Sequence, residues 1–500
     1  MLQLATMFTQ SNTNFSSYKM ENEMSFGTIQ FQISDIPAKS AEFNIALIID
    51  NSSSMDDACD QDGRKRMQYA KFTAEQLCRK AQENATGPIH ISLTTFDTNV
   101  VNIFDMQQLT ADTVGLMASQ ISTIYPNGST NIGAVLNEIQ RMAQVQPEFI
   151  AFLLTDGQAT SGERNIKQLI ELACQIPNTV QLELIGYGAD HDFKLLKGIQ
   201  QARANTGYRF IAEFEKSSFA CSEIIYRLLN RLAKNVRICV QNGEIYNWKN
   251  DTWGPEINVD NLVTKMNKTY AVRSSDPTQF KARIFGISIE TNEPFVYDIC
   301  EEPLLLANIT KEWLRNKTMR TVYEAGQIDD ALRRTEKMLK QQMAKQKLTD
   351  LMTEIKQYMD DNDLREDKML TMLCDDIFTC HETIGIRNGN MYIHARQSSQ
   401  GTQSIYNVEP PKARHFDLSE FELSMPQLAR SVSVRVASQF EDAENAEEDD
   451  IQNCSMTNPL IRRPAIRGHT MSCVDDSPYA ELGAIQFMRG TSIQTPTNNI

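Results

Sequence analysis

A carboxylate and two hydroxyls follow directly after a run of five apolar residues in the N-terminal part of the chain. The apolar run is residues 45–49, and Asp50, Ser52 and Ser54 come next at alternate positions. Such a run predicts a strand that is buried on both faces. Because ligands of open α/β sheets bind beyond the carboxyl ends of the parallel strands, the three side chains are expected to face one point at a sheet edge. Asp and Ser are also common in turns, so this spacing alone does not define a site.

Two further stretches place oxygen-bearing side chains at comparable positions. Residues 126–134 carry Thr130 just before a predicted helix, and residues 149–157 contain a second apolar run that ends in Asp156. Three loops are therefore expected to converge on one edge of the sheet.

Together these residues resemble the von Willebrand factor type A domain and its metal-ion-dependent adhesion site, which is built from Asp-x-Ser-x-Ser, a distant Thr and a distant Asp. The matching positions are Asp50, Ser52, Ser54, Thr130 and Asp156. The resemblance implies that the hydroxyls touch one divalent cation, that the aspartates act mostly through water, and that one position stays free for an acidic group from outside. Oxygen ligands without His or Cys suit Mg²⁺, Mn²⁺ or Ca²⁺ rather than zinc or copper. The alternative is that these residues only cap the following segments and form turns.

The loop after Ser54 holds further carboxylates beside the expected metal site. They are Asp56, Asp57, Asp60 and Asp62, and Arg64, Lys65 and Arg66 follow and can neutralise them. A second cation site of the calcium-loop type is the weaker interpretation, since Ala58 and Tyr69 stand where its first and last ligands belong. We expect a solvated acidic rim that raises the local cation concentration and repels wrong partners by like charge.

Strands and helices alternate through residues 42–234, which predicts a mostly parallel sheet with helices on both faces. This is the element order of a von Willebrand A domain, a Rossmann-like α/β fold. Residues 100–104 follow a short polar turn and are expected to form an antiparallel edge strand. Residues 217–233 are expected to form the last helix of this domain.

Outside this segment the sequence predicts a small antiparallel β-sandwich, helices and a tail. Alternation favours strands over residues 236–303, and Gln241-Asn242-Gly243-Glu244 is a hairpin signal. The order is similar to that of intracellular and inter-α-inhibitor-like families, in which a von Willebrand A domain is followed by a β-rich companion and then helices. The expected parts are a loose N-terminus (1–24), a strand joining the β-domain (25–36), the von Willebrand A domain (42–234), a β-sandwich-like domain (235–307), a helical bundle (308–382) with helices over 310–325, 328–360 and 364–380, and a mostly disordered acidic tail (396–500).

Composition narrows the class of function and the cellular compartment. The 500 residues carry a net charge of −15, which argues against nucleic-acid binding because phosphate recognition requires clustered Lys and Arg. The ten cysteines form no Cys-x-x-Cys pair and are expected to be reduced thiols. We find no convincing signal peptide and no apolar run long enough for a membrane span, so we expect a cytoplasmic, intracellular protein.

No catalytic motif is found, and we expect that the protein is not an enzyme. The six histidines show no zinc-binding spacing, and no nucleophile elbow or phosphate-binding loop occurs. His191-Asp192 is the nearest approach to a catalytic dyad, and we expect it to lie in a solvent-exposed loop.

Two functions from different classes remain. The first is a metal-dependent protein–protein interaction module, for adhesion or as an adaptor, that binds an Asp or Glu side chain of a partner protein through the divalent cation. The alternative is a structural scaffold whose helices and tail bind partners while the metal only stabilises the fold.

Overall fold

The computed structural model describes most of the first four fifths of the chain. The described residues are 7–20, 23–36, 42–58, 63–85, 87–188, 191–203, 205–211, 223–300, 309–328, 332–386 and 389–403. The expected acidic tail beyond residue 403, as well as Asp60 and Asp62, lies outside them.

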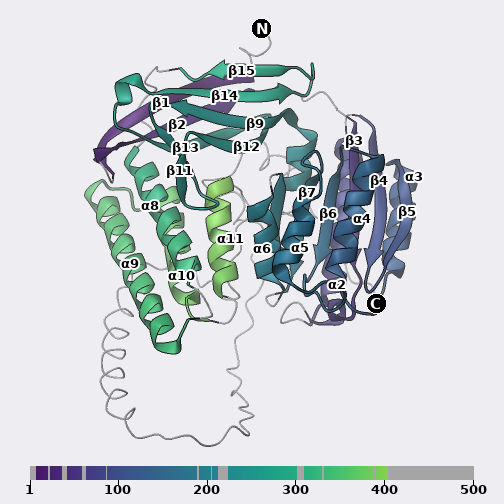
Figure 1. Cartoon of the computed structure of the whole chain (residues 1–500). Coiled ribbons are helices and arrows are strands. Elements are labelled where there is room, and N and C mark those ends of the chain that lie inside the picture. Colours follow the sequence, from purple (N-terminus) through teal and green to yellow (C-terminus); the bar gives the residue numbers. More distant parts are fainter. Residues whose placement is uncertain are drawn as a thin grey trace, which may run out of the picture. The chain divides into compact units, whose positions relative to one another are not determined.

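The main sheet has six strands in the order β5-β4-β3-β6-β7-β8 (Figure 1). Their bounds are β3 Phe43–Asp50, β4 Ile89–Phe96, β5 Val100–Gln108, β6 Ile150–Thr155, β7 Gln181–Tyr187 and β8 Thr206–Ile211. All neighbours are parallel except β5, which is antiparallel to β4. The predicted antiparallel edge strand is thus confirmed. In β3 every residue except Asn44 is buried, as expected of an apolar strand in the middle of a covered sheet.

Helices on both faces of the main sheet complete the α/β fold, as predicted. They are α2 Arg66–Asn84, α3 Ala111–Thr123, α4 Ile132–Val145, α5 Ile166–Cys174 and α6 Phe193–Ala202. The chain moves from β3 outward to β4 and returns to β6 on the other side of β3, so right-handed crossovers place α2 on one face and α4 to α6 on the other. Helix α3 has no counterpart in the prediction. Its N-cap is Thr110, whose hydroxyl accepts a hydrogen bond from the Thr113 N–H.

The last predicted helix of this domain is shorter than expected at its C-terminal end. Residues 223–229 are helical, and strand β9 (Arg231–Gln241) already begins where the prediction continued the helix to residue 233. Residues 212–222 lie outside the described residues. Arg231, Leu232 and Ala233 leave the helix because their backbones pair with β12 (Glu256–Val263) and β14 (Lys281–Ser288).

A sandwich of two antiparallel sheets forms the β-rich part (Figure 1). One sheet has the order β1-β2-β13-β10-β11 and the other has the order β12-β9-β14-β15. The strands not yet defined are β1 Phe8–Lys19, β2 Ser25–Ile33, β10 Glu244–Asn247, β11 Thr252–Gly254, β13 Asn267–Ser274 and β15 Pro294–Asp298. Side chains of both sheets, such as Phe31, Val272, Ile238 and Ile284, share one hydrophobic core. The strand predicted over residues 25–36 joins this sandwich by pairing with β13.

Two expectations for the sandwich were wrong. Residues 8–19 are not loose but form β1, because they pair with β2 and Phe8 stacks on Tyr297 with ring centroids 3.8 Å apart. The predicted hairpin at Gln241–Glu244 does not form a two-stranded unit, since β9 and β10 belong to different sheets. The Asn242 backbone has a φ of 58°, and the turn passes the chain from one sheet to the other.

Four helices follow the sandwich in the described part of the chain. They are α8 Ile309–Gly326, α9 Arg334–Asp361, α10 Lys368–Thr383 and α11 Gly389–Thr402. The first three were predicted, although α9 begins later than expected. Helix α11 corrects the prediction of a disordered tail from residue 396. Its Arg396 is fully buried and pairs with Asp375 at 2.6 Å and Asp376 at 2.9 Å. The helix is thus held partly by buried ion pairs, which an apolar periodicity does not reveal.

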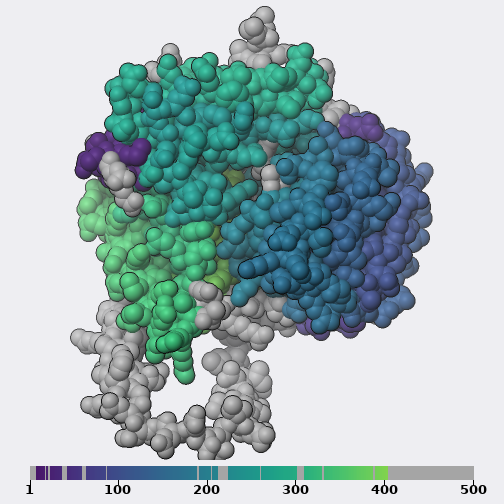
Figure 2. All heavy atoms as spheres, viewed as in Figure 1, coloured from purple at the N-terminus to yellow at the C-terminus, as the bar shows by residue number. Residues whose placement is uncertain are grey.

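Among the described residues, no helix combines the length and the apolar character needed to cross a membrane. In the space-filling view, the α/β domain is drawn mostly in blue, and most of the sandwich is drawn in teal (Figure 2).

Candidate functional site

The candidate site lies at the carboxyl edge of the main sheet, where the connections reverse direction. Asp50 is the last residue of β3, and Asp156 directly follows β6. These two strands are neighbours, with Ile49 opposite Leu154. Because the chain leaves β3 toward one side of the sheet and β6 toward the other, the two carboxylates stand at a topological switch point, where open α/β sheets bind their ligands.

Asp50 is completely buried and held on both carboxylate oxygens. Its Oδ1 accepts a hydrogen bond from the Ser52 N–H at 2.9 Å, and its Oδ2 accepts one from the Thr155 hydroxyl at 2.5 Å. Burial raises the pKa of Asp50 from 3.8 to about 7, and the negative charge of Asp156 adds to the rise. The two carboxylates are therefore close enough to repel each other, and a cation between them would relieve that repulsion.

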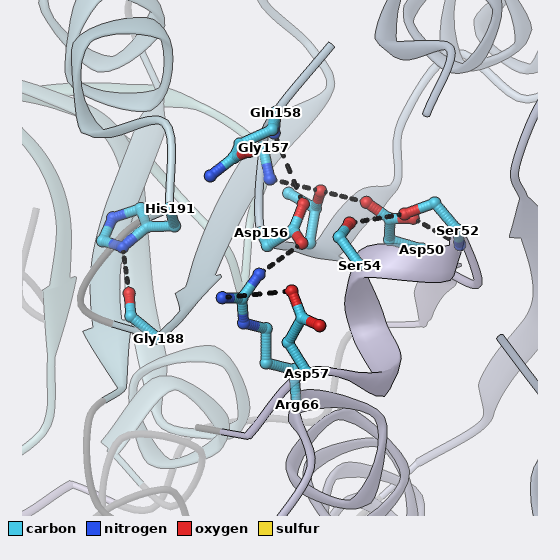
Figure 3. Close-up of polar contacts among 11 residues, drawn as sticks. Asp50, Ser52, Ser54, Asp57, Arg66, Asp156, Gly157, Gln158, Gly188 and His191 are labelled. Atoms are coloured by element: carbon cyan, nitrogen blue, oxygen red, sulfur yellow. Dashed lines mark hydrogen bonds and ion pairs between the residues drawn. The ribbon is translucent and has the colours of Figure 1, made fainter. Parts of the chain in front are cut away.

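The two serine hydroxyls lie side by side. Ser52 Oγ and Ser54 Oγ are 3.2 Å apart. Ser54 belongs to a short 3-10 helix, Ser53–Asp56, which is anchored by the buried Met55. Figure 3 shows Asp50, Ser52, Ser54 and Asp156 pointing toward one another. Four of the five predicted ligands are thus grouped at one edge.

Thr130, the fifth predicted ligand, is buried in a loop that is tied to both neighbouring loops. The Asn127 N–H donates to the Asn51 carbonyl at 2.6 Å, and the Ser53 N–H donates to the Gly128 carbonyl at 3.1 Å. On the other side, the Thr130 N–H donates to the Thr160 hydroxyl at 2.8 Å. The three loops expected from the sequence therefore meet at this edge, as predicted.

Arg66 also lies at this site, although the sequence predicted only that it would neutralise the acidic loop. Its Nη1 donates to Asp156 Oδ2, as Figure 3 shows, and the two atoms are 2.7 Å apart. The side chains of Arg66 and Asp156 are 3% and 0% exposed. The sequence suggested that Arg66 neutralises the acidic loop, but its Nη2 lies 3.9 Å from Asp57 Oδ2, at the outer limit of an ion pair. The sequence offered one signal for this role of Arg66. The residue follows a Gly and two basic residues and is the first residue of α2.

The expected acidic rim is partly present. Asp56 is exposed and pairs with Lys65 at 2.7 Å, so one basic residue neutralises the loop as expected. Asp57 is exposed as well. Asp60 and Asp62, together with any second cation site that they form, lie outside the described residues.

His191 does not lie in a solvent loop, contrary to expectation. The side chain is 5% exposed, its Nδ1 hydrogen-bonds the Gly188 carbonyl at 2.7 Å, and its Nε2 hydrogen-bonds the Tyr208 hydroxyl. The neighbouring Asp192 caps α6 by accepting from the Leu195 N–H, and its own N–H donates to the Asp156 carbonyl at 2.8 Å. Both ring nitrogens of His191 are engaged, so the residue braces the loop beside Asp156.

The donor set fits a hard divalent cation. Among the described residues, no group of three or more His, Cys, Asp and Glu could hold a metal ion. Any metal bound here would therefore depend on the Ser and Thr hydroxyls together with Asp50 and Asp156. Neutral and anionic oxygens without nitrogen or sulfur suit Mg²⁺, Mn²⁺ or Ca²⁺.

The fold defines a doubly wound α/β domain with a candidate site at its switch point. Comparison with known proteins identifies the type of domain. Residues 44–224 match the family described as von Willebrand factor type A domain. The chain therefore contains a von Willebrand factor type A domain over these residues. No curated protein matches the chain.

The solved structures that this chain matches include bacterial and archaeal proteins. One is a von Willebrand factor type A protein from Catenulispora acidiphila, 10% identical over 80% of this chain and 98% of that chain, with a TM-score of 0.51. A second is the ArnB paralog VWA2 from Sulfolobus acidocaldarius, 15% identical over 79% of this chain and 97% of that chain, with a TM-score of 0.45. A third is the PilB minor pilin from Streptococcus sanguinis, 13% identical over 44% of this chain and 78% of that chain, with a TM-score of 0.34. At 10% identity, the likeness to the Catenulispora acidiphila structure concerns the fold alone.

Proposed function

We propose that the von Willebrand A domain of this protein binds one divalent cation, Mg²⁺ or alternatively Mn²⁺ or Ca²⁺, and uses it to hold an Asp or Glu side chain of a partner protein. The proposal makes the chain an adhesion or adaptor module rather than an enzyme.

The observation that carries the proposal is the pairing of two fully buried carboxylates with two adjacent hydroxyls. Asp50 and Asp156 are both 0% exposed, and the Ser52 and Ser54 hydroxyls are 3.2 Å apart beside them. Burying an ionised carboxylate is costly unless a positive charge or several hydrogen-bond donors compensate it. Arg66 compensates only one of these two carboxylates. A second buried carboxylate at a switch point, with hydroxyl oxygens beside it as further ligands, favours a site for a cation over a set of turns.

The contacts of each side chain indicate its role in binding the cation. The hydroxyls of Ser52, Ser54 and Thr130 would bind the cation directly. Asp50 is fixed by Thr155 and Ser52, so it would orient water rather than move. When bound, the cation supplies a Lewis acid for a carboxylate from the partner.

The proposal also places the protein inside the cell. All six cysteines for which the structure describes a state are free thiols: Cys78, Cys174, Cys239, Cys300, Cys374 and Cys380. Free thiols are the usual state in reducing compartments. The thiol chemistry is the support for an intracellular location. Fractionation of cells that produce the tagged full chain tests this location.

A scaffold is the second candidate function, because one helix offers apolar side chains to solvent. Met338, Leu339 and Met343 on α9 are 51%, 58% and 56% exposed. Helix α9 lies at the green surface visible in Figure 2. Methionine-rich helix faces are adaptable protein-binding surfaces, and in this case the metal would only stabilise the fold.

A matched pair of serine variants tests the first function. Ser54→Ala removes one proposed ligand. Ser53→Ala makes the same change at the neighbouring exposed residue, whose hydroxyl donates to the Gly128 carbonyl and is not a proposed ligand. We expect Ser54→Ala to weaken Mg²⁺ binding at least about tenfold in isothermal titration calorimetry, whereas Ser53→Ala retains it. Thr130→Ala should behave like Ser54→Ala.

Partner capture from a lysate then separates the two functions. If captured proteins are lost both with EDTA and with Ser54→Ala, the metal-dependent module is supported. If they are retained in both conditions but lost when Met338, Leu339 and Met343 are changed to Ser, the scaffold is supported. Absence of Mg²⁺ binding by the wild-type chain refutes the metal-dependent function.

A further inference from the structure

A buried guanidinium stands at an edge that is proposed to receive another cation. Arg66 pairs with Asp156 at 2.7 Å, and both side chains are at least 97% buried, as their exposed fractions of 3% and 0% show. An ion pair with so little solvent around it is weakly screened. The charge of Arg66 therefore acts on every other charge at this edge.

The position of Arg66 is set by the backbone and not by the side chain alone. Its N–H donates to the Asp57 carbonyl at 3.1 Å, and residues Ala58 and Lys65 form an isolated antiparallel bridge. Arg66 is also the first residue of α2. The backbone of Arg66 is thus fixed by the Ala58–Lys65 bridge on one side and by helix α2 on the other.

The consequence is a change in the charge of the site. Asp50 and Asp156, when ionised, contribute two negative charges, and Arg66 contributes one positive charge. A divalent cation on the two carboxylates alone would give a neutral site. Asp57 is 66% exposed and therefore screened, so only the buried groups are counted. With Arg66 present, the same buried site with its cation carries one net positive charge, which a single carboxylate from outside neutralises.

We propose that Arg66 sets the charge of the metal edge: it lowers the affinity for the divalent cation and reserves the cation's positive charge for an acidic partner. Arg66 is a positioning residue, because it acts on the cation through Asp156. The inference rests on the proposed function, and it adds a specific cause for partner preference. A carboxylate is favoured over a neutral oxygen ligand because only a carboxylate cancels the remaining charge.

Arg66 has a second effect when no cation is bound. Its guanidinium compensates the buried carboxylate of Asp156, which would otherwise lack a counter-charge. The ion pair therefore makes the fold less dependent on a bound metal. Removal of the positive charge should make folding depend on the metal instead.

Three variants of the full chain isolate the charge of Arg66. Arg66→Gln removes the charge but keeps a hydrogen-bond donor for Asp156, and Arg66→Lys keeps the charge. Lys65→Gln is the matched control, because Lys65 is one residue away but is 49% exposed and pairs with Asp56 instead. Mg²⁺ alone is titrated into each protein by isothermal titration calorimetry at constant ionic strength.

We expect Arg66→Gln to bind Mg²⁺ about tenfold more tightly than the wild type, because one buried positive charge no longer opposes the cation. Arg66→Lys and Lys65→Gln should stay within about threefold of the wild type, the latter because exposed charges are screened. Thermal unfolding in EDTA should occur at a lower temperature in Arg66→Gln than in Arg66→Lys, and Mg²⁺ should remove this difference.

The outcomes separate this inference from the proposed function. If the wild type binds Mg²⁺ but Arg66→Gln binds it no more tightly, the charge-setting role is overturned while the metal site stands. If the wild type does not bind Mg²⁺ and Arg66→Gln does, the role of Arg66 is supported and the proposed function of the wild type is lost. If neither binds, both are overturned. Should Arg66→Gln fail to fold in EDTA, its recovery of structure on addition of Mg²⁺ supports the inference, and failure to recover contradicts it.

Discussion

Conversion of Asp156 to Asn should strongly destabilise the metal-free protein, because it removes the buried carboxylate that pairs with the buried Arg66 guanidinium. The two side chains are 3% and 0% exposed and their atoms are 2.7 Å apart. Removal of one partner of a buried ion pair typically costs about 3–5 kcal/mol, since the remaining charge stays desolvated. We therefore expect Asp156→Asn to lower the free energy of unfolding by about 3 kcal/mol in EDTA.

The double variant Arg66→Met/Asp156→Asn tests the physical cause. Because it removes both charges, it should recover most of the lost stability. Glu138→Gln is the matched control: it makes the same carboxylate-to-amide change in the Glu138–Arg141 pair, in which Arg141 is 62% exposed. Exposed pairs contribute less than about 1 kcal/mol, so this control should unfold nearly as the wild type does.

Differential scanning calorimetry of the full chain in EDTA measures these differences. For a domain of this size a loss of about 3 kcal/mol corresponds to a shift of the unfolding temperature by about 6–12 °C. The reasoning is refuted if Asp156→Asn unfolds within about 2 °C of the wild type. It is equally refuted if the double variant is no more stable than Asp156→Asn.

Three further predictions follow from the buried charges and the helix ends. The pKa of Asp50 is raised in the folded protein, so its contribution to stability is fully present below pH 3.8 and is lost as the pH rises through about 7. In EDTA the unfolding temperature should therefore fall over this pH window. Mg²⁺ should counteract this fall, and Asp50→Asn should make the fall smaller. Arg396→Met should leave Asp376 buried without its counter-charge and lower the free energy of unfolding by about 3 kcal/mol, with faster proteolysis of α11, whereas Arg365→Met at a 73% exposed residue should change little. Asp192→Ala should remove the cap of α6 and cost about 1 kcal/mol, measured by the same calorimetry.

The α/β domain was largely predictable because its signals are local. Residues 45–49 and 150–154 are uninterrupted apolar runs, and parallel strands covered by helices require such runs. The polar residues that end these strands then fall at one edge for topological reasons. For this reason the sequence predicted that three loops meet at one edge. These loops carry Asp50, Ser52, Ser54, Thr130 and Asp156.

The elements that were missed lack a local apolar signal. Strand β1 is mostly polar and is fixed by pairing with β2 and by Phe8 against Tyr297. Helix α11 is held partly by Arg396 between Asp375 and Asp376, and its sequence is rich in Gln and Ser. In both cases the stabilising contacts come from residues distant in the chain, which no periodicity within the segment can report.

The sequence by itself determined the type of domain and the oxygen donors at its edge, since strand hydrophobicity and ligand chemistry are properties of the residues in order. Only the tertiary structure decided the net charge of the site that those oxygen ligands form. Arg66 precedes Asp156 by 90 residues, and nothing in the local pattern distinguishes it from the basic neighbours that face solvent. Its burial against Asp156 follows from the packing of α2 and the loop before it, and that contact converts a site with two negative charges into a site with one.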